Sequence, residues 1–253
     1  MDIGDAAALV TGGGSGLGEA TAERLARAGA RVAVPDVNMD GARGVAERIG
    51  GLALDCDVSD AASAEAAVAA AREAHGPPAV LVNCAGIAPA KRIVGRDGPM
   101  PLDEFARVIE VNLIGSFNLA RLAAVAMFER EANADGERGV IVSTASVAAF
   151  EGQIGQAAYT ASKGGIAALT IQMAREFAAR GVRVLSIAPG LFGTPLLLGM
   201  PEEVQAGLAA SVPFPQRFGK PEEFAELVAH IVANPMLNGE TIRLDGALRM
   251  QPR

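Results

Sequence analysis

The chain has 253 residues, half of them hydrophobic and a fifth charged, which is the composition of an ordinary globular protein that buries its own core without disulfide or metal support. Its formal net charge is −7 and it has no basic block, so binding to nucleic acid is not expected as its main activity. The two cysteines, Cys56 and Cys84, and the two histidines, His75 and His230, are isolated from one another, and no metal site is predicted.

The sequence shows no pattern of a targeting signal or a membrane span. The segment Met1–Asp5 lacks a basic stretch followed by an apolar one. No uninterrupted apolar run approaches the roughly 20 residues that a membrane-spanning helix needs. We therefore expect a cytoplasmic protein that makes no membrane contact.

Short apolar runs alternate along the chain with stretches of helical character. The runs predict strands buried on both faces, at residues 6–10, 32–35, 52–54, 79–82, 140–142, 184–188 and 240–244. Helices are predicted at residues 16–28, 61–75, 101–128, 157–180 and 221–233. This alternation predicts one α/β domain over residues 1–253, a doubly wound (Rossmann) parallel sheet of about seven strands with helices on both faces.

Two long segments, 87–100 and 190–219, break this rhythm and are predicted to be irregular. Both follow predicted strands, so both should emerge at the carboxyl edge of the sheet, where ligands bind in this architecture. The second segment is predicted to be a substrate lid over about residues 190–219, with Gly190 and Gly193 as candidate hinges. Its apolar residues either cover a substrate or pack at a subunit interface.

A glycine-rich turn, Thr11-Gly12-Gly13-Gly14-Ser15-Gly16-Leu17-Gly18, follows the first strand. Glycines let the backbone approach a pyrophosphate closely, and the helix that begins there offers unpaired N–H groups. Asp36 ends the second strand, where an acidic side chain accepts hydrogen bonds from ribose hydroxyls and repels a 2′-phosphate. Neither Ser15 nor Val37 offers a cation to such a phosphate, so these residues favour NAD over NADP.

The only tyrosine, Tyr159, lies four residues before Lys163 at the start of a predicted helix, and Ser146 follows the preceding strand. The spacing places Tyr159 and Lys163 on one helical face. A cation about 4 Å away, at an effective dielectric of about 20, would favour the phenolate by up to about three pKa units. Tyr159 would then accept the proton of an alcohol while a hydride leaves the carbon. Taken alone, the Tyr–Lys pair fits an ordinary amphipathic helix better.

In combination, these motifs resemble the short-chain dehydrogenases/reductases, and the resemblance covers essentially the whole chain. The residues that carry it are Thr11-Gly12, Gly16, Gly18, Asn83-Cys84-Ala85-Gly86, Asn112, Ser146, Tyr159, Lys163 and Pro189-Gly190.

The resemblance implies a role for each of these residues. Tyr159 would be the general acid/base, Lys163 would lower its pKa and hold the nicotinamide ribose, and Ser146 would orient the substrate oxygen. Asn112 would support a water relay to Lys163. The other cofactor contacts would come from Gly12, Ser15, Gly16, Leu17, Gly18, Asp36, Asp57, Val58, Asn83, Cys84, Ala85, Gly86, Pro189, Gly190, Phe192 and Thr194. The family usually has a second asparagine at position 84, so Cys84 is expected to be a small packing residue.

Five stretches, at 83–88, 144–153, 188–196, 212–215 and 237–247, resemble one subgroup of the family. This resemblance implies NAD-dependent interconversion of 3-hydroxyacyl-CoA and 3-oxoacyl-CoA by a homotetramer. Gln156 would either touch an acyl oxygen or have a structural role. Lys91, Arg92 and Arg96 would either meet the CoA phosphates or form a solvated basic patch. Two alternatives remain open: a hydroxysteroid or other secondary alcohol as substrate, and a scaffold subunit of a larger complex.

Overall fold

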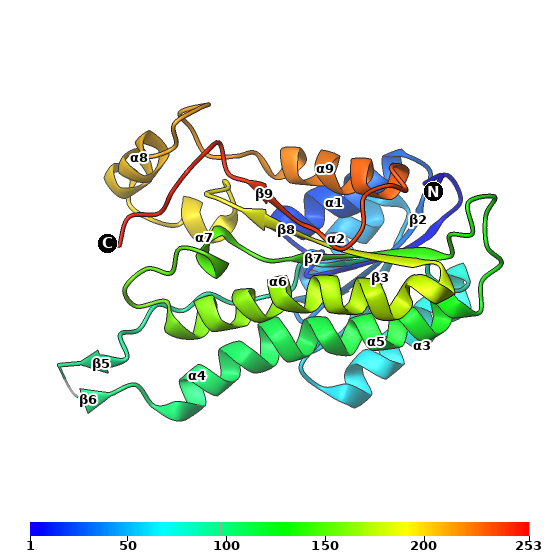
Figure 1. The fold of residues 1–253 in the computed structure, drawn as a ribbon, viewed down its shortest axis with the longest axis horizontal. Helices are drawn as coiled ribbons and strands as arrows, with labels where there is room; N and C mark the ends of the chain where they lie inside the picture. Colours follow the sequence, from blue (N-terminus) through cyan, green and yellow to red (C-terminus); the bar gives the residue numbers. More distant parts are fainter. Residues whose placement is uncertain (97, 253) are drawn as a thin grey trace.

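The computed structural model describes residues 1–96 and 98–252, and a parallel sheet forms its centre (Figure 1). Seven strands lie in the order β3-β2-β1-β4-β7-β8-β9, and each neighbouring pair is parallel. This confirms the predicted fold class. The strands are β1 (Ala7–Thr11), β2 (Arg31–Asp36), β3 (Leu52–Asp55), β4 (Val80–Asn83), β7 (Gly139–Thr144), β8 (Val182–Pro189) and β9 (Thr241–Leu244). The order reverses between β1 and β4, and such a switch point opens a crevice at the carboxyl edge.

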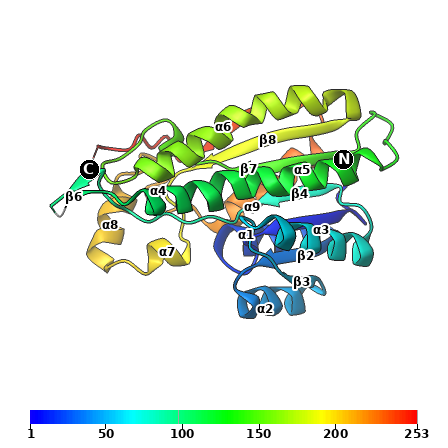
Figure 2. The same ribbon diagram turned by 90° about the horizontal axis from the view of Figure 1, so that it is seen from below.

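Helices cover both faces of the sheet (Figure 2). One face carries α1 (Gly16–Arg27), α2 (Met39–Ile49) and α9 (Pro221–Ala233). The other carries α3 (Ala61–His75), α5 (Gly115–Phe128) and α6 (Ala157–Phe177), which a 3-10 turn, η3 (Ala178–Arg180), extends. Along β1, Val10 packs on the face that carries α1, α2 and α9, and Leu9 packs on the face that carries α3, α5 and α6. Burial on both faces explains why the strands read as continuous apolar runs.

The predicted helix over 101–128 is one rod in three parts: α4 (Leu102–Ile109), the π turn η1 (Glu110–Ile114) and α5. The rod is long and apolar enough, by length and composition, to cross a membrane, but 61% of its most apolar window is buried inside the protein. Since α4 packs on α6, and α5 on the sheet and α3, the rod has the contacts of a core helix.

Five short elements differ from the sequence-based expectation. Helix α2 was not predicted, because Gly41 and Gly44 interrupt its apolar stripe. The lid segment is not irregular, since it contains α7 (Pro195–Leu198), which begins at a proline, and α8 (Glu202–Ala210), whose N-cap is Pro201. Within 87–100, β5 (Val94–Gly95) and β6 (Gly98–Pro99) pair as an antiparallel hairpin that projects from the body (Figures 1 and 2).

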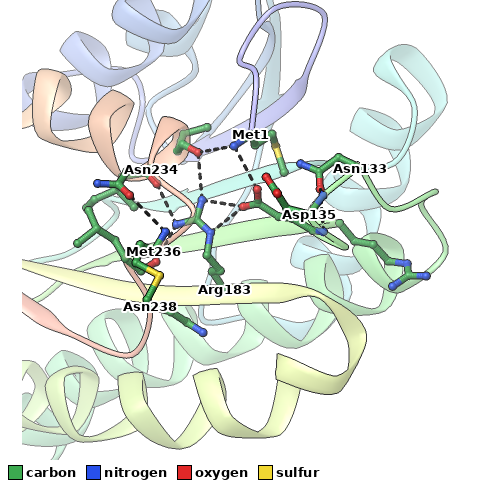
Figure 3. A network of polar contacts seen from close by, with 12 residues as sticks. Met1, Asn133, Asp135, Arg183, Asn234, Met236 and Asn238 are labelled. Carbon is green, nitrogen blue, oxygen red and sulfur yellow. Dashed lines mark hydrogen bonds and ion pairs between the residues drawn. The ribbon is translucent and has the colours of Figure 1, made fainter.

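A buried polar network fixes the amino edge of the sheet (Figure 3). Arg183, near the start of β8, donates to Glu137 at 2.7 Å and to three main-chain carbonyls, those of Ile231, Val232 and Leu237. The amino group of Met1 lies 3.1 Å from the same Glu137 carboxylate. The network joins β8 to the end of α9, at the edge opposite the crevice.

Candidate active site

The glycine-rich turn lies against the carboxyl end of β4 and tolerates no side chains at its tightest points. Gly12 has φ +62°, and a Cβ there would lie 2.6 Å from the Ala85 nitrogen. A Cβ on Gly18 would lie 2.1 Å from the Gly12 carbonyl oxygen. Helix α1 begins at Gly16, and its N-cap Ser15 makes no side-chain cap hydrogen bond. The first amides of α1 therefore face the turn without intrahelical partners, which fits a pyrophosphate.

Asp36 is held at the rim of this turn by two backbone amides. Its carboxylate accepts hydrogen bonds from Gly14 N at 2.9 Å and from Asn38 N at 2.8 Å. The neighbouring Val37 is 68% exposed and apolar. The rim of the turn therefore presents a carboxylate held in place by two amides and an exposed apolar side chain.

The residues expected at the adenine side lie at the ends of β3 and β4. Val58 is buried, and a Cβ on Gly115 would lie 2.5 Å from its Cγ2. The Asp57 carboxylate accepts hydrogen bonds from Ser59, which together with Arg107 hold its pKa below the usual value. Asn83 is buried and donates to the Ser116 carbonyl and to Ser143, so its side chain supports the sheet.

Ser146, Tyr159 and Lys163 converge at the carboxyl end of β7. Ser146 caps the 3-10 turn η2 (Val147–Ala149), and Tyr159 and Lys163 lie in the first turns of α6. The Ser146 side chain accepts a hydrogen bond from the Ala148 amide at 3.1 Å and lies close enough to Tyr159 to lower the pKa of its phenol. Lys163 Nζ donates to the Thr144 carbonyl at 2.6 Å and lies 5.7 Å from the centre of the Tyr159 ring. The structure thus brings the three residues together in one cluster, in which Ser146 and Lys163 are buried and Tyr159 is half-buried.

The pKa values in this cluster follow burial first. Burial raises the pKa of Tyr159 above its usual value of about 10, although the nearby Ser146 hydroxyl lowers it in part. Burial lowers the pKa of Lys163 to about 8. In the protein alone, Lys163 therefore does not produce the lowered Tyr159 pKa that the sequence argument expects, because its ammonium lies beside the ring and is bonded to Thr144. A second positive charge, that of an oxidised nicotinamide ring, would be present only when the cofactor is bound.

Asn112 lies in the π turn and is fully buried. Its amide accepts a hydrogen bond from Ile87 N at 2.8 Å and donates to the Ile87 carbonyl at 2.9 Å and to Ser162 Oγ at 3.1 Å. A Cβ on Gly86 would lie 3.1 Å from Asn112 Oδ1 and 3.7 Å from Lys163 Nζ. Asn112 thus joins the segment after β4 to α6, next to Lys163.

Cys84 occupies the floor of the crevice. Burial raises the pKa of its thiol to about 11, and Thr144 Oγ1 lies 3.6 Å from its sulfur. This environment favours the neutral thiol, which agrees with a packing role.

The lid begins directly above the glycine turn. A Cβ on Gly16 would lie 3.5 Å from both Thr194 and Pro195. Phe192 is buried against Gly219, and the Gly193 and Gly219 amides bond across the base of the lid. Gly190, by contrast, is not free to act as a hinge: its amide bonds to Leu244, and a Cβ there would lie 2.9 Å from Asp245 Cβ. Pro189 is buried as the last residue of β8.

The expected mouth of the crevice is bordered by the segment before the β5–β6 hairpin. Lys91 N donates to the Gly155 carbonyl at 2.7 Å, and Lys91 pairs with Gln156, the N-cap of α6. The Lys91 ammonium forms an ion pair with Glu104, so it is not a free cation for a phosphate. Arg92 and Arg96 remain exposed on this segment.

Several residues that support the cluster were not identified from the sequence. The Thr144 carbonyl holds Lys163, Ser162 holds Asn112, and the Ile87 main chain closes around Asn112. Two of these contacts use main-chain atoms, for which residue type gives no signal.

Comparisons with known proteins agree with this geometry. The family profile described as short chain dehydrogenase matches residues 6–204. The chain is 51% identical to the 3-hydroxyacyl-CoA dehydrogenase type-2 of Homo sapiens, over 97% of this chain and 95% of that protein. It is 49% identical to the protein of that name from Drosophila melanogaster, over 99% and 100% of the two chains. A crystal structure of 3-hydroxyacyl-CoA dehydrogenase type-2 from Mycobacterium avium superposes with a TM-score of 0.93, at 41% identity and 98% coverage of both chains. The fold is thus matched over nearly the full length, and the chain belongs to the short-chain dehydrogenase family.

Proposed function

We propose that this dehydrogenase interconverts 3-hydroxyacyl-CoA and 3-oxoacyl-CoA with NAD. The observation that carries the proposal is the convergence of Ser146, Tyr159 and Lys163 beside a turn that fits a dinucleotide. Sequence identity of about half the chain with proteins named 3-hydroxyacyl-CoA dehydrogenase type-2 supports the choice of substrate.

The nicotinamide ring, when bound, accepts or returns a hydride. On the protein side, Ser146 Oγ holds the substrate oxygen, and Tyr159 Oη takes the alcohol proton during oxidation and returns it during reduction. Lys163 places its ammonium beside the phenol and holds the ribose. Ser146 and Lys163 are buried and Tyr159 is half-buried, which limits the access of competing water to the reacting oxygen.

Asp36 supports NAD over NADP. Its carboxylate is held by two amides and cannot turn away without breaking both hydrogen bonds. A 2′-phosphate would meet this charge at close range, and no arginine or lysine lies at position 37 or 38 to offset it.

The residues around the expected mouth of the crevice support a CoA thioester as the substrate, with an apolar acyl chain and a charged CoA group. Leu198 and Met200 present exposed apolar surface on the lid, which suits an acyl chain. Arg92 and Arg96 provide exposed cations for CoA phosphates. Exposed apolar side chains on α5 and α6, among them Phe117, Val125 and Ile171, support self-association into a homotetramer.

The proposal is tested by measuring reduced-cofactor formation from 3-hydroxyacyl-CoA thioesters of both configurations, the free hydroxy acids and a set of hydroxysteroids. Each substrate is paired with NAD⁺ and with NADP⁺. We expect kcat/KM to be highest for a CoA thioester with NAD⁺. In Asp36→Ala, the preference for NAD⁺ should fall by about tenfold or more, since one fixed charge and its hydrogen bonds are removed.

Activity confined to an alcohol without CoA would reject the thioester assignment and leave the Ser-Tyr-Lys chemistry in place. Absence of turnover on every alcohol, with cofactor binding intact, would instead favour a scaffold role. An unchanged cofactor preference in Asp36→Ala would contradict the ribose assignment.

A further inference from the structure

A second set of polar contacts lies next to the catalytic cluster and is not used by the reaction. The loop between Ser146 and Tyr159, here called the Ser–Tyr loop (residues 150–156), connects η2 to α6. The segment after β9, here called the tail (residues 245–252), lies across this loop. In both Figure 1 and Figure 2 the C-terminus lies at the same end of the molecule as the lid and the β5–β6 hairpin.

Glu151 is the anchor on the loop side. Its carboxylate accepts hydrogen bonds from Arg243 at 2.9 Å and from the Met250 amide at 2.9 Å, and Arg249 lies 3.4 Å away. Although burial alone would raise the pKa of Glu151, these donors hold it below the usual value. Glu151 is therefore ionised at neutral pH and bonded to two points on the opposite segment.

Arg243, at the end of β9, is the anchor on the other side. Besides Glu151, its guanidinium donates to Asp245 at 2.7 Å and to the Leu248 carbonyl at 3.0 Å, and it stacks 5.5 Å from the centre of the Phe150 ring. Arg243 thus joins the Ser–Tyr loop to both ends of the tail's first turn. Arginine suits this position because its fork of donors matches several acceptors at once.

The tail also joins the lid. The Phe214 amide, at the lid's far end, donates to the Gly246 carbonyl at 3.3 Å, and a Cβ on Gly246 would lie 2.7 Å from Val212. At the other end of the tail, the Pro252 carbonyl accepts a hydrogen bond from Ile154 N, and the Gln251 carbonyl accepts one from the Gln153 side chain. The tail therefore spans two walls of the substrate crevice, the lid and the Ser–Tyr loop.

We propose that the Glu151–Arg243 pair is a positioning clamp that holds the tail across the Ser–Tyr loop and the lid, and thereby sets the affinity for the substrate. Glu151 and Arg243 act through the loop and do not touch the reacting atoms. The cofactor side of the crevice, formed by β1, α1 and β2, has no contact with the clamp residues among the hydrogen bonds of the described residues. Only the choice of an acyl-CoA as test substrate rests on the proposed function.

The test compares wild type with Glu151→Gln, Arg243→Gln, the double variant and Arg243→Lys. We expect KM for the 3-hydroxyacyl-CoA to rise about tenfold in each glutamine variant, with KM for NAD⁺ within about twofold of wild type. Because the two side chains act as one unit, the double variant should be little worse than either single variant. Arg243→Lys keeps the charge but not the fork and should be intermediate.

Hydrogen exchange supplies a readout that does not depend on turnover. In Glu151→Gln, the amides of Ile154 and Phe214 should exchange faster, since both are bonded to the tail. Glu137→Gln is the matched control: it removes one charge of a buried arginine pair at the opposite edge of the sheet, and should leave these two amides and both KM values unchanged. If a glutamine variant does not fold, the same measurements are made on Arg243→Lys.

Unchanged exchange at Ile154 and Phe214 would overturn the clamp. Faster exchange with an unchanged substrate KM, or an equal rise in both KM values, would overturn its link to substrate affinity. If wild type oxidises no CoA thioester, the proposed substrate fails while the clamp is still tested, by exchange and by KM for whichever alcohol is oxidised.

Discussion

Burial shifts the two titratable residues of the catalytic cluster toward their uncharged forms. It raises the pKa of Tyr159 and lowers that of Lys163 to about 8, so Lys163 still carries its charge at neutral pH but loses it more readily than in water. Among the described residues, Ser146 is the neighbour that shifts Tyr159 toward the phenolate. The ability of Tyr159 to act as a base at moderate pH therefore depends on Ser146 and on the charge that the cofactor adds.

Ser146→Ala should shift the pH profile of alcohol oxidation. Oxidation needs the Tyr159 phenolate, whose fraction rises with pH, and the substitution removes the hydroxyl that lowers the Tyr159 pKa. The rising limb of kcat/KM should therefore move to higher pH, with a lower plateau. The measurement is kcat/KM for oxidation between about pH 6 and pH 10.

Tyr159→Phe is the control for this profile. It should abolish turnover at every pH while NAD binding, followed by fluorescence titration of NADH, stays near that of wild type. Near-normal turnover in this variant would refute the assigned base, and a limb that does not move in Ser146→Ala would refute the role of Ser146.

The residues that carry chemistry were predictable from the sequence, while their supports were not. The spacing of Ser146, Tyr159 and Lys163 follows from one strand and one helix, both of which have strong local patterns. The support of Lys163 is a main-chain carbonyl, and the partner of Glu151 is Arg243, which lies 92 positions further along the chain. Contacts of this kind depend on the tertiary fold, and one sequence alone gives no signal for them.

Among the elements, strands were predicted better than short helices. The five inner strands are mostly buried apolar runs, the edge strands β3 and β9 are only partly buried, and the helices that pack on the sheet have the matching period. Helices α7 and α8 have only partly covered faces, and each has a proline at or directly before its first residue, so their pattern resembles that of a loop. The base of the lid is nevertheless closed, because the Gly193 amide donates to the Gly219 carbonyl and the Gly219 amide donates to the Leu191 carbonyl.

Gly219→Ala tests how tightly this base is packed. An added Cβ would lie 2.7 Å from the Phe192 ring, so the ring must shift from the position that faces the crevice. We expect the free energy of unfolding to fall by about 1–3 kcal/mol and kcat/KM to fall with it. Thermal melting and steady-state kinetics measure both.

Gly207→Ala is the matched control in the same lid. Position 207 lies in α8, where nothing is within 4 Å of an added Cβ, so alanine should stabilise the helix by up to about 1 kcal/mol without affecting Phe192. Equal behaviour of the two variants would show that the packing of Phe192 on Gly219 has no effect.

At the scale of the whole molecule, the two edges of the sheet have different tasks. The carboxyl edge collects the glycine turn, the catalytic cluster, the lid and the tail, whereas the amino edge carries the buried Arg183–Glu137 pair (Figure 3). Removing one member of a buried pair leaves the other charge uncompensated, which costs more than the pair itself contributes.

Glu137→Ala should therefore destabilise the protein without changing its chemistry. We expect the free energy of unfolding to fall by about 3–5 kcal/mol, measured by urea denaturation, because Arg183 remains buried without its carboxylate. Glu226→Ala, which removes an exposed pair with Arg24, should cost less than about 1 kcal/mol. A large loss of kcat/KM in folded Glu137→Ala would contradict this separation of the two edges.

The π turn at Glu110–Ile114 has a geometric consequence for the rod that contains it. A residue inserted into an α-helix rotates everything before it by about 100° relative to everything after it. The stripe that α5 turns toward the sheet and α3 is therefore not continued by α4, which faces α6 instead. The single rod thus packs against two neighbours that lie in different directions, and Asn112 lies in the turn where the direction of its packing face changes.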